Sequence, residues 1–61
     1  MNATFKFDRE TKGAVRYAEV DAEGNELDQN SALIGTLYIR KNKLGKEIPS
    51  IVSIELSFEE S

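Results

Sequence analysis

A group of basic side chains directly after a tyrosine is the part of this sequence best suited to binding a ligand. Half of the chain's eight Lys and Arg residues lie within seven positions of one another. Cationic side chains bind phosphate, and a neighbouring aromatic ring can stack on a nucleobase, so the group indicates single-stranded nucleic acid as one candidate ligand. The net charge of −3 favours the other interpretation, that these charges only solvate a loop. The residues are Tyr38, Arg40, Lys41, Lys43 and Lys46.

Acidic residues gather in the segment 19–28, which raises the question of a calcium site. An EF-hand loop needs glycine at its sixth position and glutamate at its twelfth. Counted from Asp21, Gly24 is the fourth residue and Ala32 the twelfth, so the pattern fails. We therefore expect a solvated acidic loop and no metal site.

The residue types needed for most enzyme chemistry are missing from the sequence. It contains no His and no Cys, which excludes His-assisted nucleophilic catalysis, thiol chemistry and the usual zinc ligands. A carboxylate pair such as Glu19 with Glu55 remains formally possible, but it would need a cleft that a 61-residue sheet rarely encloses. We expect no enzymatic activity and no cofactor.

Alternating apolar and polar residues predict that these side chains are carried by β-strands. The predicted strands lie near 3–10, 14–21, 33–41 and 51–58, and glycines and the single proline punctuate the connections between them. Neighbouring strands joined by short connections pair antiparallel. The expected fold is therefore all-β, a single small domain over 1–61 with one sheet of about four strands.

The first two strands are predicted to form a hairpin with a bulge at its turn. Pairing Glu10 with Ala14 would set Asp8 opposite Arg16, which is a favourable charge pair. A two-residue turn at 12–13 would instead set Arg9 against Arg16, so we favour the bulged turn, with Gly13 at positive φ.

Apolar residues are more numerous than one face of such a sheet needs. The inward face takes most of them, but Val20, Ile34 and Tyr38 fall on the other face and are predicted interface residues. A chain this short has no disulfide to stabilise it, so the sheet must curl into a barrel-like form or pack on a partner. We expect a non-catalytic protein–protein interaction module that works as a homodimer or docks on another protein. Single-stranded nucleic-acid binding through 38–46 is the alternative.

Two segments resemble a family of short uncharacterised bacterial proteins. They are FDRETKGAVRY, residues 7–17, and GTLYIRK, residues 35–41, followed by LGKEIP. The resemblance implies a bacterial source and adds no activity. The absence of a long apolar run and of a signal-peptide core predicts a cytoplasmic protein with no membrane partner.

Overall fold

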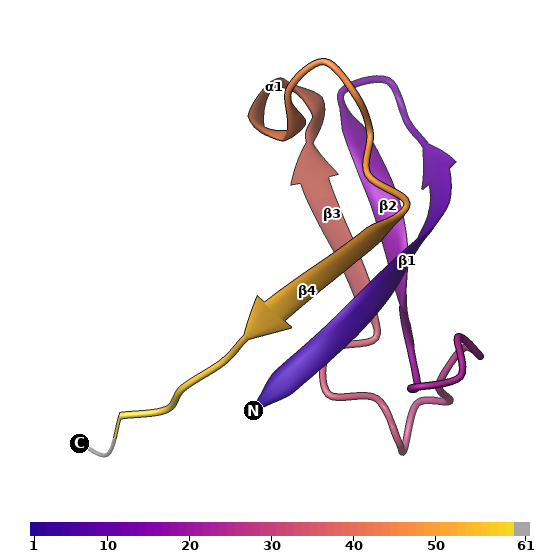
Figure 1. The fold of residues 1–61 in the computed structure, drawn as a ribbon, viewed down its shortest axis with the longest axis vertical. Helices are drawn as coiled ribbons and strands as arrows, with labels where there is room; N and C mark the ends of the chain where they lie inside the picture. Colours follow the sequence, from indigo (N-terminus) through magenta and orange to yellow (C-terminus); the bar gives the residue numbers. More distant parts are fainter. Residues whose placement is uncertain (60–61) are drawn as a thin grey trace.

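Four strands form one antiparallel sheet in residues 1–59, the part of the chain that this computed structural model describes. They are β1 (Asn2–Glu10), β2 (Ala14–Val20), β3 (Thr36–Arg40) and β4 (Ile51–Glu55), and the one-turn helix α1 (Lys41–Leu44) follows β3. The strand order is β3-β2-β1-β4, and the sheet curls into a half-barrel (Figure 1). This architecture confirms the predicted all-β fold with four antiparallel strands.

The hydrophobic core lies on the concave face of this single curled sheet. Phe5 of β1 and Val15 and Tyr17 of β2 are fully buried, and Ala3 is nearly so. They come from the two central strands, where neighbours on both sides exclude water. Apolar residues of the flanking elements pack against this centre but stay half-buried: Leu37, Ile39, Leu44, Val52 and Ile54.

The β1–β2 hairpin has a bulge, but not at the predicted place. Thr11 and Ala14 bond to each other across a two-residue loop, so the strands continue with Arg9 opposite Arg16. The register then shifts between Phe7 and Arg9, which restores Phe7 opposite Tyr17. The predicted bulge at the turn is therefore wrong, and Gly13 is not among the described glycines with positive φ. The extra residue is Asp8, and its position beside Arg16 relieves the repulsion that made this register look unfavourable.

The connection from β3 to β4 closes one end of the concave face. Helix α1 places Leu44 against the core, and the chain then crosses the sheet to reach β4 (Figure 1). The buried Tyr17 hydroxyl donates a 2.8 Å hydrogen bond to the Pro49 carbonyl, which holds this crossing down. The helix ends at Gly45, which has a positive φ of 86° and an extended ψ of −158°.

The acidic segment between β2 and β3 is more ordered than a solvated loop. The Asp21 carboxylate accepts hydrogen bonds from the backbone N–H groups of Glu23 and Asn25 at 2.8 and 3.0 Å. These bonds form a tight turn that returns the chain so that Glu26 bridges to Val20 at the end of β2.

Candidate interaction surfaces

Strand register assembles three cationic side chains around Tyr38 on the convex face of the sheet. Arg9 lies opposite Arg16, and Arg16 lies opposite Tyr38, which makes one row across β1, β2 and β3. Arg40 follows two residues after Tyr38 on the same face, opposite Ala14. Tyr38 is 57% exposed, and together with Arg40, Thr11, Gly13 and Ala14 it lines a shallow hollow of about 340 Å³. An exposed ring can stack on a flat group, while guanidinium groups at neighbouring positions, Arg40 and Arg16 here with Arg9 one strand further, contact an anion.

Sequence reasoning missed Arg9 and Arg16 as members of this row. The signal was present, because the two-residue turn would have aligned them, but we rejected that turn as repulsive. The bulge residue Asp8 resolves the conflict, since its Oδ2 lies 3.2 Å from Arg16 Nε. That N–H has no well-aligned hydrogen-bond acceptor, so the contact is an ion pair and not a hydrogen bond. The ion pair partly neutralises the row and leaves Arg9 and Arg40 as its exposed cations.

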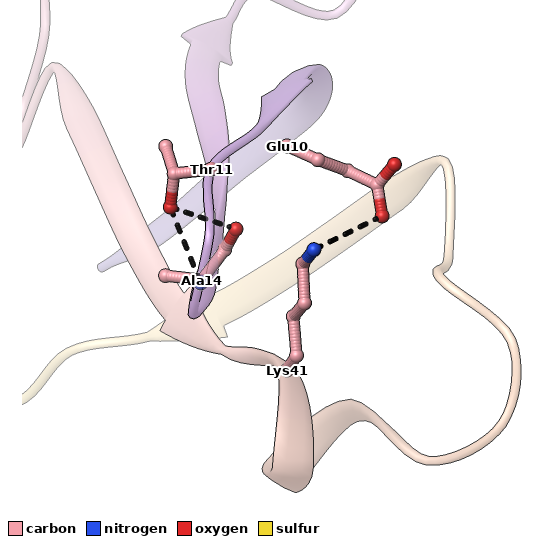
Figure 2. Close-up of polar contacts among 4 residues, drawn as sticks. All are labelled: Glu10, Thr11, Ala14 and Lys41. Carbon is pink, nitrogen blue, oxygen red and sulfur yellow. Dashed lines mark hydrogen bonds and ion pairs between the residues drawn. The ribbon is translucent and has the colours of Figure 1, made fainter.

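The predicted basic segment does not form one continuous surface. Arg40 ends β3 on the convex face, whereas Lys41 begins α1 and turns toward the β1–β2 loop. There its Nζ lies 3.6 Å from Glu10 Oε1, and Thr11 contacts Ala14 close by (Figure 2). Lys43 and Lys46 are exposed, within α1 and just after it. Of the five predicted contact residues, the structure joins only Tyr38 and Arg40 at one hollow.

The predicted interface residues Val20 and Ile34 lie in different environments. Val20 is only 5% exposed, because the acidic segment folds back over the end of β2. It therefore belongs to the interior of this chain, which removes it from the predicted interface. Ile34 is 41% exposed in the segment before β3, outside the strand that was expected to contain it.

Glu19 on the concave side of β2 fixes the segment that leads into β3. The residue is 5% exposed, and its carboxylate accepts hydrogen bonds from three successive backbone N–H groups. Oε2 accepts from Leu33 at 3.0 Å, and Oε1 accepts from Ile34 at 2.7 Å and from Gly35 at 2.9 Å. Gly35 has φ of 95°, which turns the three groups inward and delays β3 until Thr36.

This hydrogen bonding decides the charge state of Glu19. Burial by itself raises the pKa of the carboxyl group, but the bonds from Gly35, Ile34 and Leu33 outweigh it and hold the pKa below its ordinary value. The group therefore stays ionised, and its oxygens already have three donors. A hollow of about 480 Å³ lies beside Glu19, at the end of the sheet near Met1. The one buried carboxylate that lines this hollow is that of Glu19, and its oxygens already accept backbone hydrogen bonds. We therefore assign Glu19 a structural role.

The carboxylate pair considered from the sequence does not form. Glu19 lies opposite Phe5, on the concave face, whereas Glu55 lies opposite Asn2, on the convex face. The sheet separates the two side chains. Within residues 1–59, no group of three or more acidic side chains converges in a way that could hold a metal ion.

The concave face is covered from one end only, so apolar surface remains open toward β4. Phe7 packs edge-on against Tyr17, with ring centroids 6.3 Å apart, yet 38% of it is exposed. Val52 and Ile54 of β4 stay half-buried, and Ile48, in the crossing before Pro49, is 37% exposed. Ile51 is 52% exposed but lies opposite Lys6 on the convex face, and Phe58, beyond the end of β4, is 73% exposed. Sheets normally bury such a face against a second layer. The described chain has a smallest extent of 16 Å, which is one curled layer and no more.

Strands β3 and β4 are the two edges of the sheet over the described residues. Ser50 and Leu56, on either side of β4, bond to Phe7 and Met1, so even-numbered residues of β4 face β1. Backbone groups alternate along a strand, and therefore Ile51, Ser53 and Glu55 direct their N–H and C=O groups to the open edge. By the same reasoning Thr36, Tyr38 and Arg40 do so on β3. Unpaired edges of this kind are templates for strand addition.

Comparison with known proteins does not assign the chain to a family. No family model matches it, and neither the curated proteins nor the solved structures contain a match. Among the described residues, no helix has the length and apolar character needed to cross a membrane.

Proposed function

We propose that this protein is a non-catalytic protein–protein interaction module that docks a protein through its concave face and the adjoining edge of β4. The observation that carries the proposal is the core cluster itself. Val52 and Ile54 pack against Phe5 and Ala3 but remain only half-buried, because no second layer covers them. Covering this surface would recover about 25 cal/mol for each Å² of apolar area removed from water.

A bound protein fits this surface better than a small molecule does. The open apolar residues are spread along the edge of the sheet and do not enclose a cavity. Strand addition would satisfy the unpaired backbone groups of β4 while the partner's side chains cover Val52 and Ile54. Phe7 and Ile48 would then lie within the docked area, and each contributes an exposed apolar side chain.

Photo-crosslinking in cells that produce the protein tests this proposal. A photoreactive phenylalanine analogue at Phe7 or Phe58 should give covalent protein adducts, either of the chain with itself or with another protein. The same group at Lys12, on the exposed β1–β2 loop, is the control. Adducts at the two phenylalanines that excess unlabelled protein competes away would support docking here. Equal labelling at Lys12, or none at the phenylalanines, would contradict it.

The row on the convex face favours a second candidate function, the binding of single-stranded nucleic acid. Tyr38 would stack on a base while Arg9 and Arg40 contact phosphate groups, with Arg16 between them. The arrangement supports this function because three separate strands bring the cations to one exposed ring. The net charge of −3 opposes it, and binding should therefore be weak and strongly salt-dependent.

Charge-matched variants distinguish binding by this row from general attraction to cations. Arg40→Glu and Lys43→Glu change the net charge equally, but only Arg40 adjoins Tyr38 in the hollow. Affinity for a single-stranded oligonucleotide at low salt should fall at least about tenfold in Arg40→Glu and much less in Lys43→Glu. Tyr38→Ala should also weaken binding. Equal losses in the two charge variants, or no detectable binding by the unaltered protein, would rule out this function.

A further inference from the structure

We infer that the occupant of the β4 edge is a second copy of this chain, paired antiparallel about a twofold axis at Ser53. The inference rests on the proposed docking function and specifies its partner. Its starting observation is the direction in which the backbone N–H and C=O groups of β4 point. Ile51, Ser53 and Glu55 all point their N–H and C=O groups to the open edge, as the bonding of β4 to β1 requires.

A twofold axis at Ser53 pairs these groups completely. Ser53 faces itself, and Ile51 of each copy faces Glu55 of the other. All three are residues whose backbone groups point outward, so each facing pair can exchange both of its hydrogen bonds. The three facing pairs match the length of β4, Ile51–Glu55, with none of its outward backbone groups left over. The result is a continuous antiparallel sheet of eight strands.

The side chains are complementary in the same register. On the concave face, Val52 of each copy lies opposite Ile54 of the other, so two half-buried apolar residues cover each other across the junction. On the convex face, Glu55 lies opposite Ile51 and away from its own copy, which avoids a like-charge pair. Ile48 and Phe58, before and after β4, are 37% and 73% exposed and lie near the two ends of this junction.

The other open edge is less suited to this pairing. β3 ends in Arg40 and runs directly into α1, whose Lys41 and Lys43 add further charge beside it. Cationic side chains are a usual protection of an edge against strand addition. β4 has one charged residue, Glu55, and no bulge in its pairing with β1. Exposed apolar residues lie at both edges, Ile51 and Phe58 at β4 and Ile34 and Tyr38 at β3, so the difference in charge is what separates the two edges.

Cysteine cross-linking tests both the edge and the register, because the chain has no cysteine of its own. Facing residues in this geometry have Cα atoms about 5.5 Å apart, within the range that a disulfide spans. Mild oxidation should therefore convert most of Ser53→Cys into a disulfide-linked dimer. Thr36→Cys, a small polar residue on the other open edge, should not cross-link. Glu55→Cys should not cross-link either, since a strand rise of about 3.3 Å per residue places its two copies about 13 Å apart.

Sedimentation of the unaltered protein should give a particle of twice 6.8 kDa at micromolar concentration. Ser53→Lys and Ser53→Glu should each dimerise at least about tenfold more weakly, because like charges would face each other. An equimolar mixture of the two should recover dimers. A monomeric unaltered protein, cross-linking at Thr36→Cys in place of Ser53→Cys, or a mixture no better than its components would overturn the inference. If adducts at Phe7 then join the monomer to another protein, the docking function stands and only the partner is wrong.

Discussion

Replacing Glu19 with glutamine should cost this domain most of its stability, although the two side chains have the same shape. The amide oxygen of the new side chain, in place of Oε1, could still accept from Ile34 and Gly35. Its NH₂ group would then face the N–H of Leu33, which now donates to Oε2 at 3.0 Å. Two donors would meet, so one charge-assisted hydrogen bond is lost and a backbone N–H is left unsatisfied. The other two bonds become neutral and weaker.

The size of the loss follows from these contacts. Hydrogen bonds to charged groups contribute about 1.5–3 kcal/mol, and an unsatisfied buried donor costs about 1–3 kcal/mol. Glutamine avoids the cost of burying a charge, which opposes this loss. The lowered pKa of Glu19 shows that the hydrogen bonds outweigh burial in the native state. We expect a decrease of about 2–4 kcal/mol in the free energy of unfolding, in a domain whose core supplies about 3–5 kcal/mol.

Urea unfolding followed by circular dichroism measures this change, with Glu23→Gln as the control. Glu23 is exposed and loses the same charge, so its variant should stay within about 0.5 kcal/mol of the unaltered protein. The β3 amides should also lose hydrogen-exchange protection in Glu19→Gln. A midpoint for Glu19→Gln equal to that of Glu23→Gln would refute the idea that this carboxylate organises the entry to β3.

The remaining predictions concern pH and three other contacts. Because the native pKa of Glu19 is below its ordinary value of 4.5, its stabilisation is full above that value and is lost as pH falls through the native pKa; acid titration of the melting temperature should show a smaller decrease in Glu19→Gln than in the unaltered protein. Tyr17→Phe removes the hydrogen bond to Pro49 and should cost about 1 kcal/mol in urea titration, and an unchanged midpoint would show that this bond does not hold the crossing. Phe5→Ala empties the centre of the core and should cost about 3–5 kcal/mol, leaving little folded protein by circular dichroism at 37 °C; a cooperative melt near that of the unaltered protein would contradict the assigned core. Asp8→Ala leaves Arg9 and Arg16 opposed without a carboxylate and should cost up to about 1 kcal/mol, an effect that thermal melts in about 1 M salt should largely remove if it is electrostatic.

The periodicity of the sequence was enough to predict the number of strands and their alternation. Phe5 and Phe7 alternate with polar residues, as do Val52 and Ile54, and alternation of this kind depends only on the two-residue repeat of a strand. The connections between strands were also predictable, because glycines and the single proline mark them. These features are local, so they depend only on residues that are close together in the sequence.

Contacts between distant segments decided the features that the sequence left open or predicted wrongly. Pairwise charge reasoning rejected Arg9 opposite Arg16, because it could not foresee a bulge that would bring Asp8 beside them. The register of β2 with β3 placed Arg16 opposite Tyr38, which lies beyond the whole acidic segment in the chain. From the sequence alone, Glu19 is one more residue of an acidic segment. Only the fold brings three backbone N–H groups to its carboxylate. The energy of each arrangement depends on which groups share a buried or paired position, and only the tertiary structure determines that.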